Sequence, residues 1–517
     1  MTASEASAPR ERPSYWLTRF LVLRVLGLVY LAAFASLAWQ VLPLLGERGL
    51  LPAASWLGRM QASAGSRLEG FLQNPSWFWL GASDAALLGA ALLGVALSLP
   101  LLLGFANAIQ LALLWSLQLS VIQIGQLWYG YGWEIQLAET GFLAIFLCPL
   151  ASARAFPKSP PPLAMIWLLR WLIFRIMLGA GLIKLRGDPC WRDLTCLFFH
   201  YETQPIPNPL SRTFHFLPHP LLQAGVLMNH AAELVAPWFM LGPRRVRHAA
   251  GAVMLAFQGM LIASGNLSFL NWLTIVPILA CFDDSLLRRV LPRALTQRAE
   301  RAAAAARPAR VQGALALALA ALVAFLSLGP VLNLVSERQV MNTSFDRLSL
   351  VNTYGAFGTV GRERDEIIFE GTSDEAPGES SQWRAYEFPC KPGDPQRRAC
   401  WVSPFQPRLD WQIWFAAMAT PSQYPWTLHF VWKLLEGDRG VIRLLANDPF
   451  PQAPPRWVRA RFYRYRFADP DDPSGALWNR ELLGEWLPPL SAEDPRLREA
   501  LIRFGWLEPG APARTSR

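Results

Sequence analysis

Long apolar runs are the feature that most limits the folds open to this chain. A helix of roughly 20 apolar residues crosses a bilayer, and the sequence contains nine runs near that length. They lie at about 20–45, 84–103, 104–126, 134–152, 163–185, 219–242, 248–265, 267–287 and 311–334. Hydrophobic residues make up 52% of the 517 residues, which is too apolar for an ordinary soluble enzyme. The sequence therefore predicts a polytopic α-helical membrane bundle of about nine spans within residues 20–335.

Positive charge predicts the orientation of these spans. Basic loops stay on the cytoplasmic side, and three arginines precede the first run, which makes residues 1–19 a cytoplasmic tail. The first run is too long for a cleaved signal peptide and lacks a small-residue cleavage site. Nine crossings then place the C-terminus outside and the arginine-rich loops 151–162, 242–248 and 288–310 inside. Topology thus explains the net charge of +10 without a nucleic-acid partner, and the basic face favours contact with anionic membrane lipid.

The composition changes after about residue 335. Residues 336–517 are rich in Pro, Trp and charge and contain no spanning run, so we expect a separate exoplasmic C-terminal domain long enough to bury a core. The stretches "DEIIFEG", "WRAYEF" and "WVRARFYRYRF" have the composition or alternation of strands. "DWQIWFAAM" and "WTLHFVWKLLEG" suggest short helices. The prediction is a mainly β soluble domain that follows the membrane bundle.

The last of these strands is expected to have two unlike faces. One face carries Val458, Ala460 and Phe462, and the other carries Arg459, Arg461, Tyr463 and Tyr465. The arginine and tyrosine face either binds a protein partner, because these types are common at interface hot spots, or is the solvated side of an ordinary strand.

Six cysteines divide by predicted location. Cys190 and Cys196 lie in the predicted outer loop 188–218, and Cys390 and Cys400 lie in the C-terminal domain, where disulfides persist. We predict the pairs 190–196 and 390–400, while crossed pairings between loop and domain stay open. Cys148 and Cys281, within spans, are expected to act as small inert hydrophobes.

The loop 188–218 and its C-terminal flank also carry three histidines. His200, His215 and His219 accompany Cys190 and Cys196, but their spacing matches no standard zinc pattern. An oxidising compartment favours a disulfide over a metal site. No metal or cofactor is predicted.

Polar residues inside the spans are the remaining signal for function, because the sequence has no nucleophile elbow, zinc-protease, P-loop, dinucleotide or C-x-x-C motif. Charged side chains are costly in hydrocarbon and usually face a bundle interior or a cavity. The candidates are Glu134, Glu139, Arg170, Arg175, Lys184, His230 and Glu233.

Lys184 stands out because the chain has only four lysines among its 48 basic residues. Lysine can lose its proton when desolvated and arginine cannot, so Lys184 is a candidate base, with His230 and Glu233 as helpers. The alternative is that Lys184 snorkels from its helix end to the membrane surface. His230 and Glu233, three apart on one helical face, are either a proton relay or a polar pair that holds helices together.

Several long motifs resemble one family of membrane proteins. "GLIKLRGDPCWRDLTCLFFHYETQPIPNPLSRTFHFLP", "NHAAELVAPW", "GNLSFLNWL", "NTYGAFGTVGRERDEIIFEG", "YEFPCKPGDP" and "PFQPRLDWQIWFAAM" occur in this order. Together they are similar to the lipase maturation factors, from the first span to near residue 470. The resemblance implies a membrane-embedded folding factor whose outer domain engages a secreted client, such as a lipase, and it transfers no catalytic residues.

The location implied by this resemblance depends on the source of the chain. The eukaryotic members lie in the endoplasmic reticulum membrane, with the C-terminal domain in the lumen. The preference for arginine over lysine and the alanine-rich loops look bacterial, which predicts a bacterial inner membrane and a periplasmic C-terminal domain.

A shorter resemblance keeps an enzyme hypothesis open. "GAGLIKL" followed by Trp191 is similar to a segment of the vitamin K-dependent gamma-carboxylases, in which the lysine at the position of Lys184 acts as a base towards a reduced quinone. The alternative to a folding factor is therefore a membrane enzyme that uses Lys184 on a lipid-soluble cofactor or substrate. A redox role for Cys190 and Cys196 is a third hypothesis, although their spacing differs from that of reactive pairs.

Overall fold

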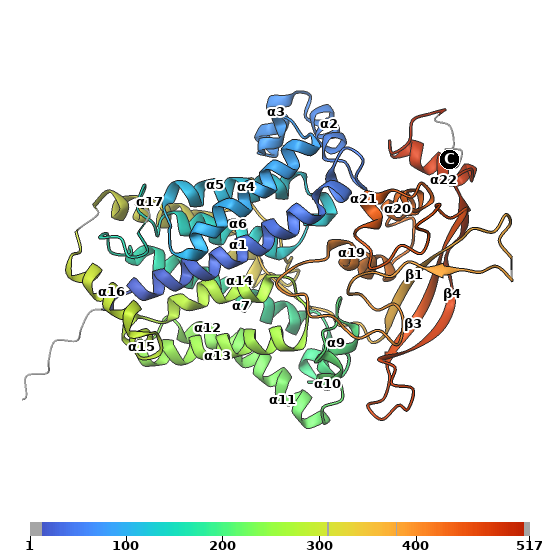
Figure 1. Ribbon diagram of the computed structural model, residues 1–517. Coiled ribbons are helices and arrows are strands. Elements are labelled where there is room, and N and C mark those ends of the chain that lie inside the picture. Colours follow the sequence, from blue (N-terminus) through green and yellow to red (C-terminus); the bar gives the residue numbers. More distant parts are fainter. Residues whose placement is uncertain (1–12, 153, 308–309, 379, 511–517) are drawn as a thin grey trace, which may run out of the picture.

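The computed structural model describes residues 13–152, 154–307, 310–378 and 380–510. Two parts are visible in Figure 1, a bundle of helices on the left and a C-terminal part (residues 336–510) with all four strands on the right. Asn and Ser residues begin several bundle helices, because their side chains accept a hydrogen bond from a free backbone N–H. Ser83 caps the helix that starts at Asp84, and Asn107 caps the helix that starts at Ala108.

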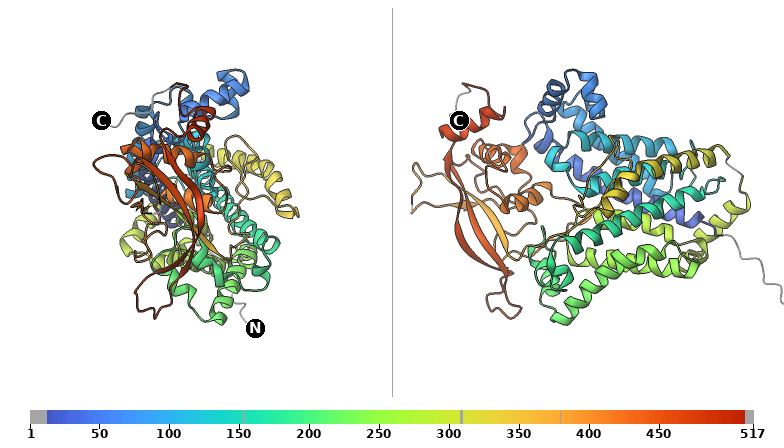
Figure 2. Two further views of the ribbon diagram at one scale, coloured as in Figure 1. Left: turned by 90° about the vertical axis from the view of Figure 1, so that its right-hand side faces the viewer. Right: turned by 180° about the vertical axis from the view of Figure 1, so that it is seen from behind.

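Several segments of the bundle run lengthwise (Figures 1 and 2). The segments are α1 (Trp16–Leu45), α4 (Asp84–Leu103), α5 (Ala108–Ile124), α6 (Gly132–Ile145), α7 (Leu163–Arg186), α11 (His219–His230) with α12 (Ala236–Phe239), α13 (Arg244–Ser264), α14 (Leu270–Ile278), and α17 (Arg310–Leu326) with α18 (Leu328–Val335). The view from behind in Figure 2 shows α17, in yellow, lying along the outside of the bundle.

Five of these segments are long and apolar enough to cross a membrane: α1, α4, α7, α13 and α17 with α18. A sixth is α14 together with α15 (Asp284–Val290), if a pair bent by 118° forms one span. The predicted count of nine spans is therefore not confirmed. The physical reason is length and continuity, because α5 has 17 residues and α6 has 14, and a π-helical turn (Ala231–Val235) interrupts the run predicted at 219–242.

The described residues of the arginine-rich loops 151–162, 242–248 and 288–310 lie at the end of the bundle away from the C-terminal part, which we call the distal end. The Asp284 carboxylate caps α1 there, accepting from the backbone N–H groups of Trp16 and Leu17 at 3.0 and 2.9 Å. The N–H of Arg307 donates to the carbonyl of Lys158 at 3.0 Å. A carboxylate at a helix N-terminus is favourable because the unpaired N–H groups there carry partial positive charge.

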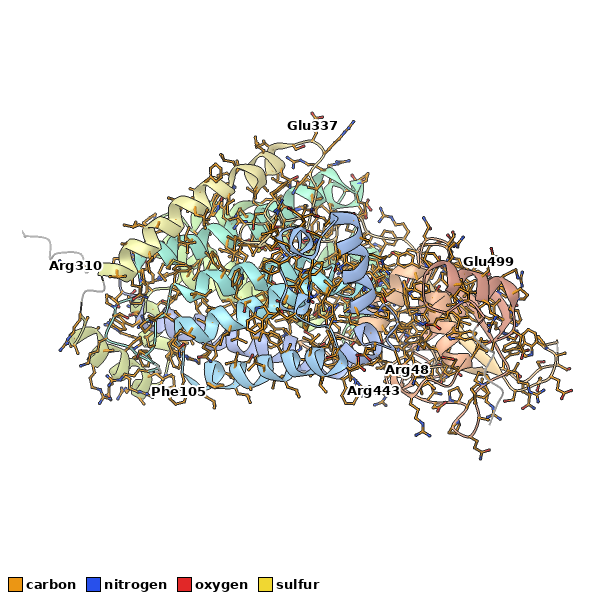
Figure 3. All side chains as sticks on the ribbon, turned by 90° about the horizontal axis from the view of Figure 1, so that it is seen from above. Arg48, Phe105, Arg310, Glu337, Arg443 and Glu499 are labelled. Atoms are coloured by element: carbon orange, nitrogen blue, oxygen red, sulfur yellow. A yellow bond between two sulfur atoms is a disulfide. The ribbon has the colours of Figure 1, made fainter. Side chains whose placement is uncertain are left out.

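Figure 3 separates the two ends in a view from above. Phe105, between α4 and α5, and Arg310 lie at the distal end, and Glu499 lies on the far side of the C-terminal part. Arg48 and Arg443 mark the line where the two parts meet. Shorter helices fill the rest of the molecule. They are α2 (Ala53–Ala64), α3 (Arg67–Gln73), α8 (Pro189–Arg192), α9 (Leu197–Thr203), α10 (Ser211–His215) and α16 (Arg293–Ala304).

The C-terminal part is built on a small antiparallel sheet with the strand order β2-β1-β3-β4. Its elements are β1 (Arg364–Thr372), β2 (Arg384–Ala385), α19 (Arg408–Ala417), α20 (Trp426–Leu435), α21 (Arg439–Ile442), β3 (Trp457–Phe467), β4 (Trp478–Ser491) and α22 (Pro495–Arg503). The predicted strand stretches fall in β1, β2 and β3, and the two predicted helices are α19 and α20. The structure confirms that the C-terminal region contains a sheet, but its helices are about as extensive as its strands, so the prediction of a mainly β domain is confirmed only in part.

The two-faced pattern predicted for β3 is correct only for its first half. Val458 and Ala460 are buried as expected, but Tyr465, expected on the polar face, has no exposed surface, and its hydroxyl donates to the carbonyl of Gly393 at 2.5 Å. The register between β3 and β4 shifts at three places along the strand. Each such bulge inserts an extra residue and re-aims the side chains that follow.

One hydrophobic core runs through both parts of the molecule. Aromatic rings join them directly, since Trp128 of the bundle lies 4.9 Å from Trp426 of α20 and Trp133 lies 5.1 Å from Trp411 of α19, centroid to centroid. Gln40 of α1 donates to the carbonyl of Gln406 at 2.7 Å. The C-terminal part is thus held against the bundle by shared packing as well as by the chain connection.

Candidate functional site

Lys184 is buried near the end of α7 that faces the C-terminal part, and its side chain does not snorkel. Only 4% of the residue is exposed. Its Nζ lies 2.6 and 2.7 Å from the two carboxylate oxygens of Glu233 and 2.9 Å from Oδ1 of Asn229. An ammonium has three N–H donors, and three oxygens surround it here. This match gives a physical reason for a lysine at a position where arginine's planar fork would not fit as well.

The partners of Lys184 are aligned by the π-helical turn. Pro237 has no backbone N–H to donate to the carbonyl four residues earlier, and such a gap favours a wide turn. Asn229 and Glu233 project together from this stretch, and Nδ2 of Asn229 donates to Glu233 at 2.7 Å. The structure therefore brings together two of the predicted site residues, Lys184 and Glu233, and adds Asn229, which the sequence analysis missed.

The other candidates lie elsewhere. The ring Nε2 of His230 is 2.9 Å from the carbonyl oxygen of Trp191, and His230 does not line the cavity described below. Arg170 is buried further towards the distal end, where it donates to the carbonyl of Ala280 at 2.9 Å and to the hydroxyl of Tyr15 at 2.8 Å. Arg170 thus holds helices together and takes no part in the Lys184 cluster.

Arg175 and Glu139 form a second buried ion pair. The segment that follows the last bundle helix contacts this pair. The free oxygen of Glu139 accepts from the backbone N–H of Asn352 at 3.0 Å and from the hydroxyl of Tyr354 at 2.7 Å. Arg175 also donates to the carbonyl of Asn352 at 2.6 Å. The two charges predicted within the spans therefore bind the first segment of the C-terminal part.

A third buried ion pair joins α6 to α19. Arg408 donates from Nη2 to Glu134 at 2.7 Å and from Nη1 to the carbonyl of Trp128 at 2.5 Å, and it has no exposed surface. Its guanidinium lies 3.5 Å from the ring centre of Tyr129. Arg408 was not predicted from the sequence, because it is the first residue of α19 and lies close to Asp410 and Gln412, as a surface arginine could.

A fourth buried cluster lies under the sheet. Glu366 of β1 pairs with Arg364 at 2.6 Å and with Lys391 at 2.9 Å, and all three side chains are buried. Arg364 also donates to the carbonyls of Glu202 and Pro205, at 2.9 and 3.0 Å. Residues two apart on a strand share a face. The spacing of Arg364 and Glu366 in the predicted strand could therefore have indicated that the two side chains lie side by side.

A cavity of about 440 Å³ lies beside the Lys184 cluster and Arg364. Bundle residues of α7, α13 and α14 form one wall, and residues of α9, of α19 and of the segment 354–365 form the other. Lys184, Asn229 and Glu233 belong to the bundle side of the cavity, but most of the lining is apolar. A mostly apolar cavity with a few convergent polar groups is the usual form of a small-molecule site, and such sites measure roughly 300–1,000 Å³.

His200 of α9 reaches the same cavity. Burial, helped by the positive charge of Lys184, lowers the pKa of His200 to about 4, so the ring is neutral at pH 7. The edge of His200 meets the ring of Phe357 at 4.8 Å. Its ring nitrogens have no hydrogen-bond partner among the residues that the structure describes. A neutral imidazole offers one donor and one acceptor, and both are available here.

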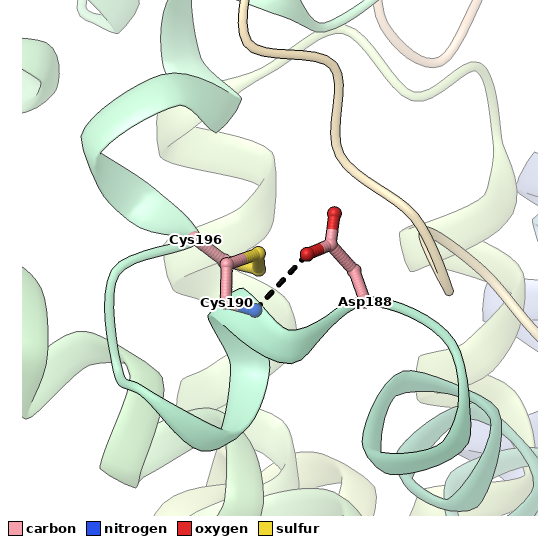
Figure 4. Close-up of side chains that lie close together, drawn as sticks. All are labelled: Asp188, Cys190 and Cys196. Atoms are coloured by element: carbon pink, nitrogen blue, oxygen red, sulfur yellow. Dashed lines mark hydrogen bonds between the residues drawn. A yellow bond between two sulfur atoms is a disulfide. The ribbon is translucent and has the colours of Figure 1, made fainter.

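The predicted disulfides Cys190–Cys196 and Cys390–Cys400 are both present. Figure 4 shows the first beside Asp188, whose carboxylate accepts from the N–H of Cys190 at 3.0 Å. The same carboxylate accepts from the N–H of Val360 at 3.2 Å and pairs with Arg362. These bonds lower the pKa of Asp188 against the effect of its partial burial. The disulfide thus anchors a turn that ties the loop after α7 to the C-terminal part.

The histidines after α8 do not converge. The ligand atoms of Asp188, Cys190 and Cys196 are close together in the described structure, but both sulfurs belong to the disulfide, and the thiolate is the form of cysteine that binds metals. His215 lies 3.8 Å from Glu202, and His219 stacks on Phe198 at 4.2 Å. The zinc alternative therefore gains no support from these positions.

Asp410 of α19 gives a testable pH dependence. Burial raises its pKa to about 6, although its Oδ1 accepts from the N–H groups of Cys390 and Lys391 at 2.7 and 2.9 Å. A pKa raised by folding contributes stability that is present below about pH 4 and is lost as the pH rises through 6. We expect Asp410→Asn, whose amide oxygen can still accept both bonds, to raise the free energy of unfolding by about 2–3 kcal/mol at pH 7 and by much less at pH 4. Thermal unfolding at the two pH values checks this, and an equal effect at both would contradict it.

Comparison with known families covers both parts of the chain. Residues 17–289 match the family described as lipase maturation factor transmembrane domain, and residues 350–488 match the lipase maturation factor C-terminal domain. No solved structure matches the chain.

Named relatives are similar over almost the whole length. Lipase maturation factor 1 of Bos taurus is 48% identical over 507 residues, covering 93% of this chain and 90% of the relative, and the Homo sapiens protein of that name is 46% identical over 96% and 91%. Lipase maturation factor 2 of Homo sapiens is 30% identical over 96% of this chain and 86% of its own length. The chain therefore belongs to the lipase maturation factor family.

Proposed function

We propose that this protein is a multi-pass membrane factor that assists the folding or assembly of secreted lipases. The observation that carries the proposal is the match to lipase maturation factors across both the bundle and the C-terminal part. The shared core and the buried ion pairs support a protein that presents its C-terminal part on a rigid membrane base.

The proposal predicts contact between the whole protein and a newly made client. A secreted lipase should crosslink to the full chain in membranes during synthesis and should be released once it is folded. A secreted protein of similar size from another class serves as the control. Equal crosslinking of both, or none of the lipase, would contradict a lipase-directed role.

We also propose that the N-terminal tail is cytoplasmic and that residues 336–517 lie on the outer side of the membrane. Two observations support this. The arginine-rich loops share the distal end, as positive residues on the cytoplasmic side would, and both disulfides lie in or next to the C-terminal part, as an oxidising compartment would allow. This orientation needs an odd number of crossings, as the nine predicted from the sequence would give, whereas five described helices, or six with the bent pair, are long and apolar enough to span on their own.

Cysteine labelling tests this orientation. Lys158 at the distal end and Ser474 in the C-terminal part are exposed, and the free Cys148 and Cys281 are buried. In sealed vesicles whose cytoplasmic face is outward, an impermeant maleimide should label Lys158→Cys at once and Ser474→Cys only after detergent is added. Labelling of both before detergent would contradict the proposed orientation.

A second candidate function is catalysis in which Lys184 acts as a base. Its amine lies on the wall of a cavity large enough for a ligand, and it would act as a base only after passing a proton to the carboxylate of Glu233. Arginine keeps the charge but cannot act as a base, so Lys184→Arg should abolish lipase maturation while the protein stays folded. Unchanged maturation would reject catalysis by Lys184. If that variant unfolds, Lys184→Gln with a normal melting temperature serves in its place.

A further inference from the structure

The cavity beside Lys184 has polar groups that no protein group uses. His200 lines it with both ring nitrogens unpartnered among the described residues. Trp411 also lines it, and its buried Nε1–H has no hydrogen-bond partner there. A fully buried donor that is left unpaired, such as the Nε1–H of Trp411, calls for an explanation, whereas the ring nitrogens of His200 keep some accessible surface. A ligand with its own donor and acceptor would supply the missing partners.

The charges on the wall select against a charged ligand. Glu233 binds the ammonium of Lys184 with both oxygens and so neutralises it. Glu363 and Asp365 also line the cavity, and both pair with the one guanidinium of Arg464. An entering ion of either sign would leave water for a mostly apolar lining, in which the charges of the described lining residues already have partners. Burying an uncompensated charge is costly, so the occupant should be neutral.

The remaining surface suits an apolar chain. Phe257 and Leu261 of α13 face Trp414 and Phe415 of α19 around the cavity. The cavity lies between helices of the membrane bundle and the C-terminal part, so a molecule dissolved in the membrane is a natural source. Burial of its chain against these side chains would supply most of the binding free energy.

We propose that this cavity binds a neutral single-chain amphiphile with a hydroxyl head group, of the long-chain alcohol class. The hydroxyl lies at His200, where it donates to the unprotonated ring nitrogen or accepts from the N–H of the other. The chain lies against the aromatic side chains of α19 and the apolar face of α13. This site is independent of the role in lipase maturation, and either can fail without the other.

Photolabelling of the full-length protein in lipid tests the site. The probe is hexadecanol that carries a diazirine in its chain, and labelled residues are mapped by mass spectrometry. We expect saturable labelling of cavity residues such as Met418 and Leu261, and unlabelled hexadecanol should compete. Ala356 lines the cavity and Ala85 is exposed on α4. Ala356→Trp should therefore reduce labelling by about tenfold through steric exclusion, and Ala85→Trp should not.

A second variant tests the contact of the hydroxyl head group alone. It remains informative even if Ala356→Trp fails to fold. His200→Phe keeps the ring shape but removes both hydrogen-bonding nitrogens. It should weaken hexadecanol labelling about two- to tenfold, the worth of one hydrogen bond, and leave labelling by a diazirine-bearing hexadecane unchanged. The proposal would be overturned if His200→Phe affected both probes equally, or if palmitic acid carrying the same diazirine labelled the cavity more strongly than hexadecanol. Labelling that neither saturates nor responds to Ala356→Trp would also overturn it.

Discussion

Arg408→Met is expected to lower the free energy of unfolding by about 3–5 kcal/mol, because it leaves the Glu134 carboxylate buried without its partner. Arg408 has no exposed surface, and it links α19 to Glu134 and to the carbonyl of Trp128. Its loss should loosen the C-terminal part first. Thermal unfolding of the purified protein and the rate of proteolysis within residues 336–510 measure the two effects.

The double variant separates the buried charge from the lost packing. Glu134→Leu combined with Arg408→Met removes both charges, so it should be more stable than Arg408→Met alone. Arg456, in an exposed pair with Glu375, is the matched control, because exposed pairs contribute little. Loss of Arg408 with no more effect than Arg456→Ala would mean that the ion pair does not hold the two parts together.

Glu139→Leu should have a similarly large effect, again about 3–5 kcal/mol. The substitution strands the Arg175 guanidinium and leaves the N–H of Asn352 and the hydroxyl of Tyr354 without their acceptor. The measurement is the unfolding midpoint in detergent, with Glu375→Leu at an exposed position as the control.

Glu139→Gln provides a graded test of the same contact. Its amide oxygen can still accept from Asn352 and Tyr354, so it should recover part of the stability that Glu139→Leu loses. If Glu139→Leu unfolds at the same temperature as the wild type, the Glu139 carboxylate does not hold the segment at Asn352 against the bundle.

The predictions from sequence were most accurate where a signal is local. Apolar runs located the bundle, strand-like composition or alternation located β1 and β3, and the predicted outer location of four cysteines indicated both disulfides. Lys184 and Glu233 were singled out because charges in apolar helices need partners, and the structure pairs them. Predicted span boundaries failed where a helix is shortened or broken, as at Pro237 and the π-helical turn, because hydropathy averages over such breaks.

Long-range contacts could not be predicted from one sequence. Arg408 and Glu134 are 274 residues apart, and nothing in the local pattern distinguishes Arg408 from a surface arginine. The cavity has the same origin, because its wall combines α7, α9 and α19, which come from separate regions of the chain. Side chains of ordinary composition acquire a special environment only through this packing.

The inferred bacterial inner membrane is the prediction with least support. It was drawn from the preference for arginine over lysine, yet the relatives reported above come from Bos taurus and Homo sapiens. The ratio of arginine to lysine varies with the source of a gene, so it does not identify the membrane in which a protein lies. The comparisons support a multi-pass membrane protein of the family and no particular organelle.

The most direct test of a lipase maturation role is rescue in cells that lack their own lipase maturation factor. Such cells, supplied with a secreted lipase, should release active enzyme when the full chain is expressed, measured as activity per lipase molecule in the medium. Arg408→Met should restore less, in proportion to the folded protein in the membrane. Full-length protein that accumulates in the membrane and leaves lipase activity at the level of empty vector would contradict the account.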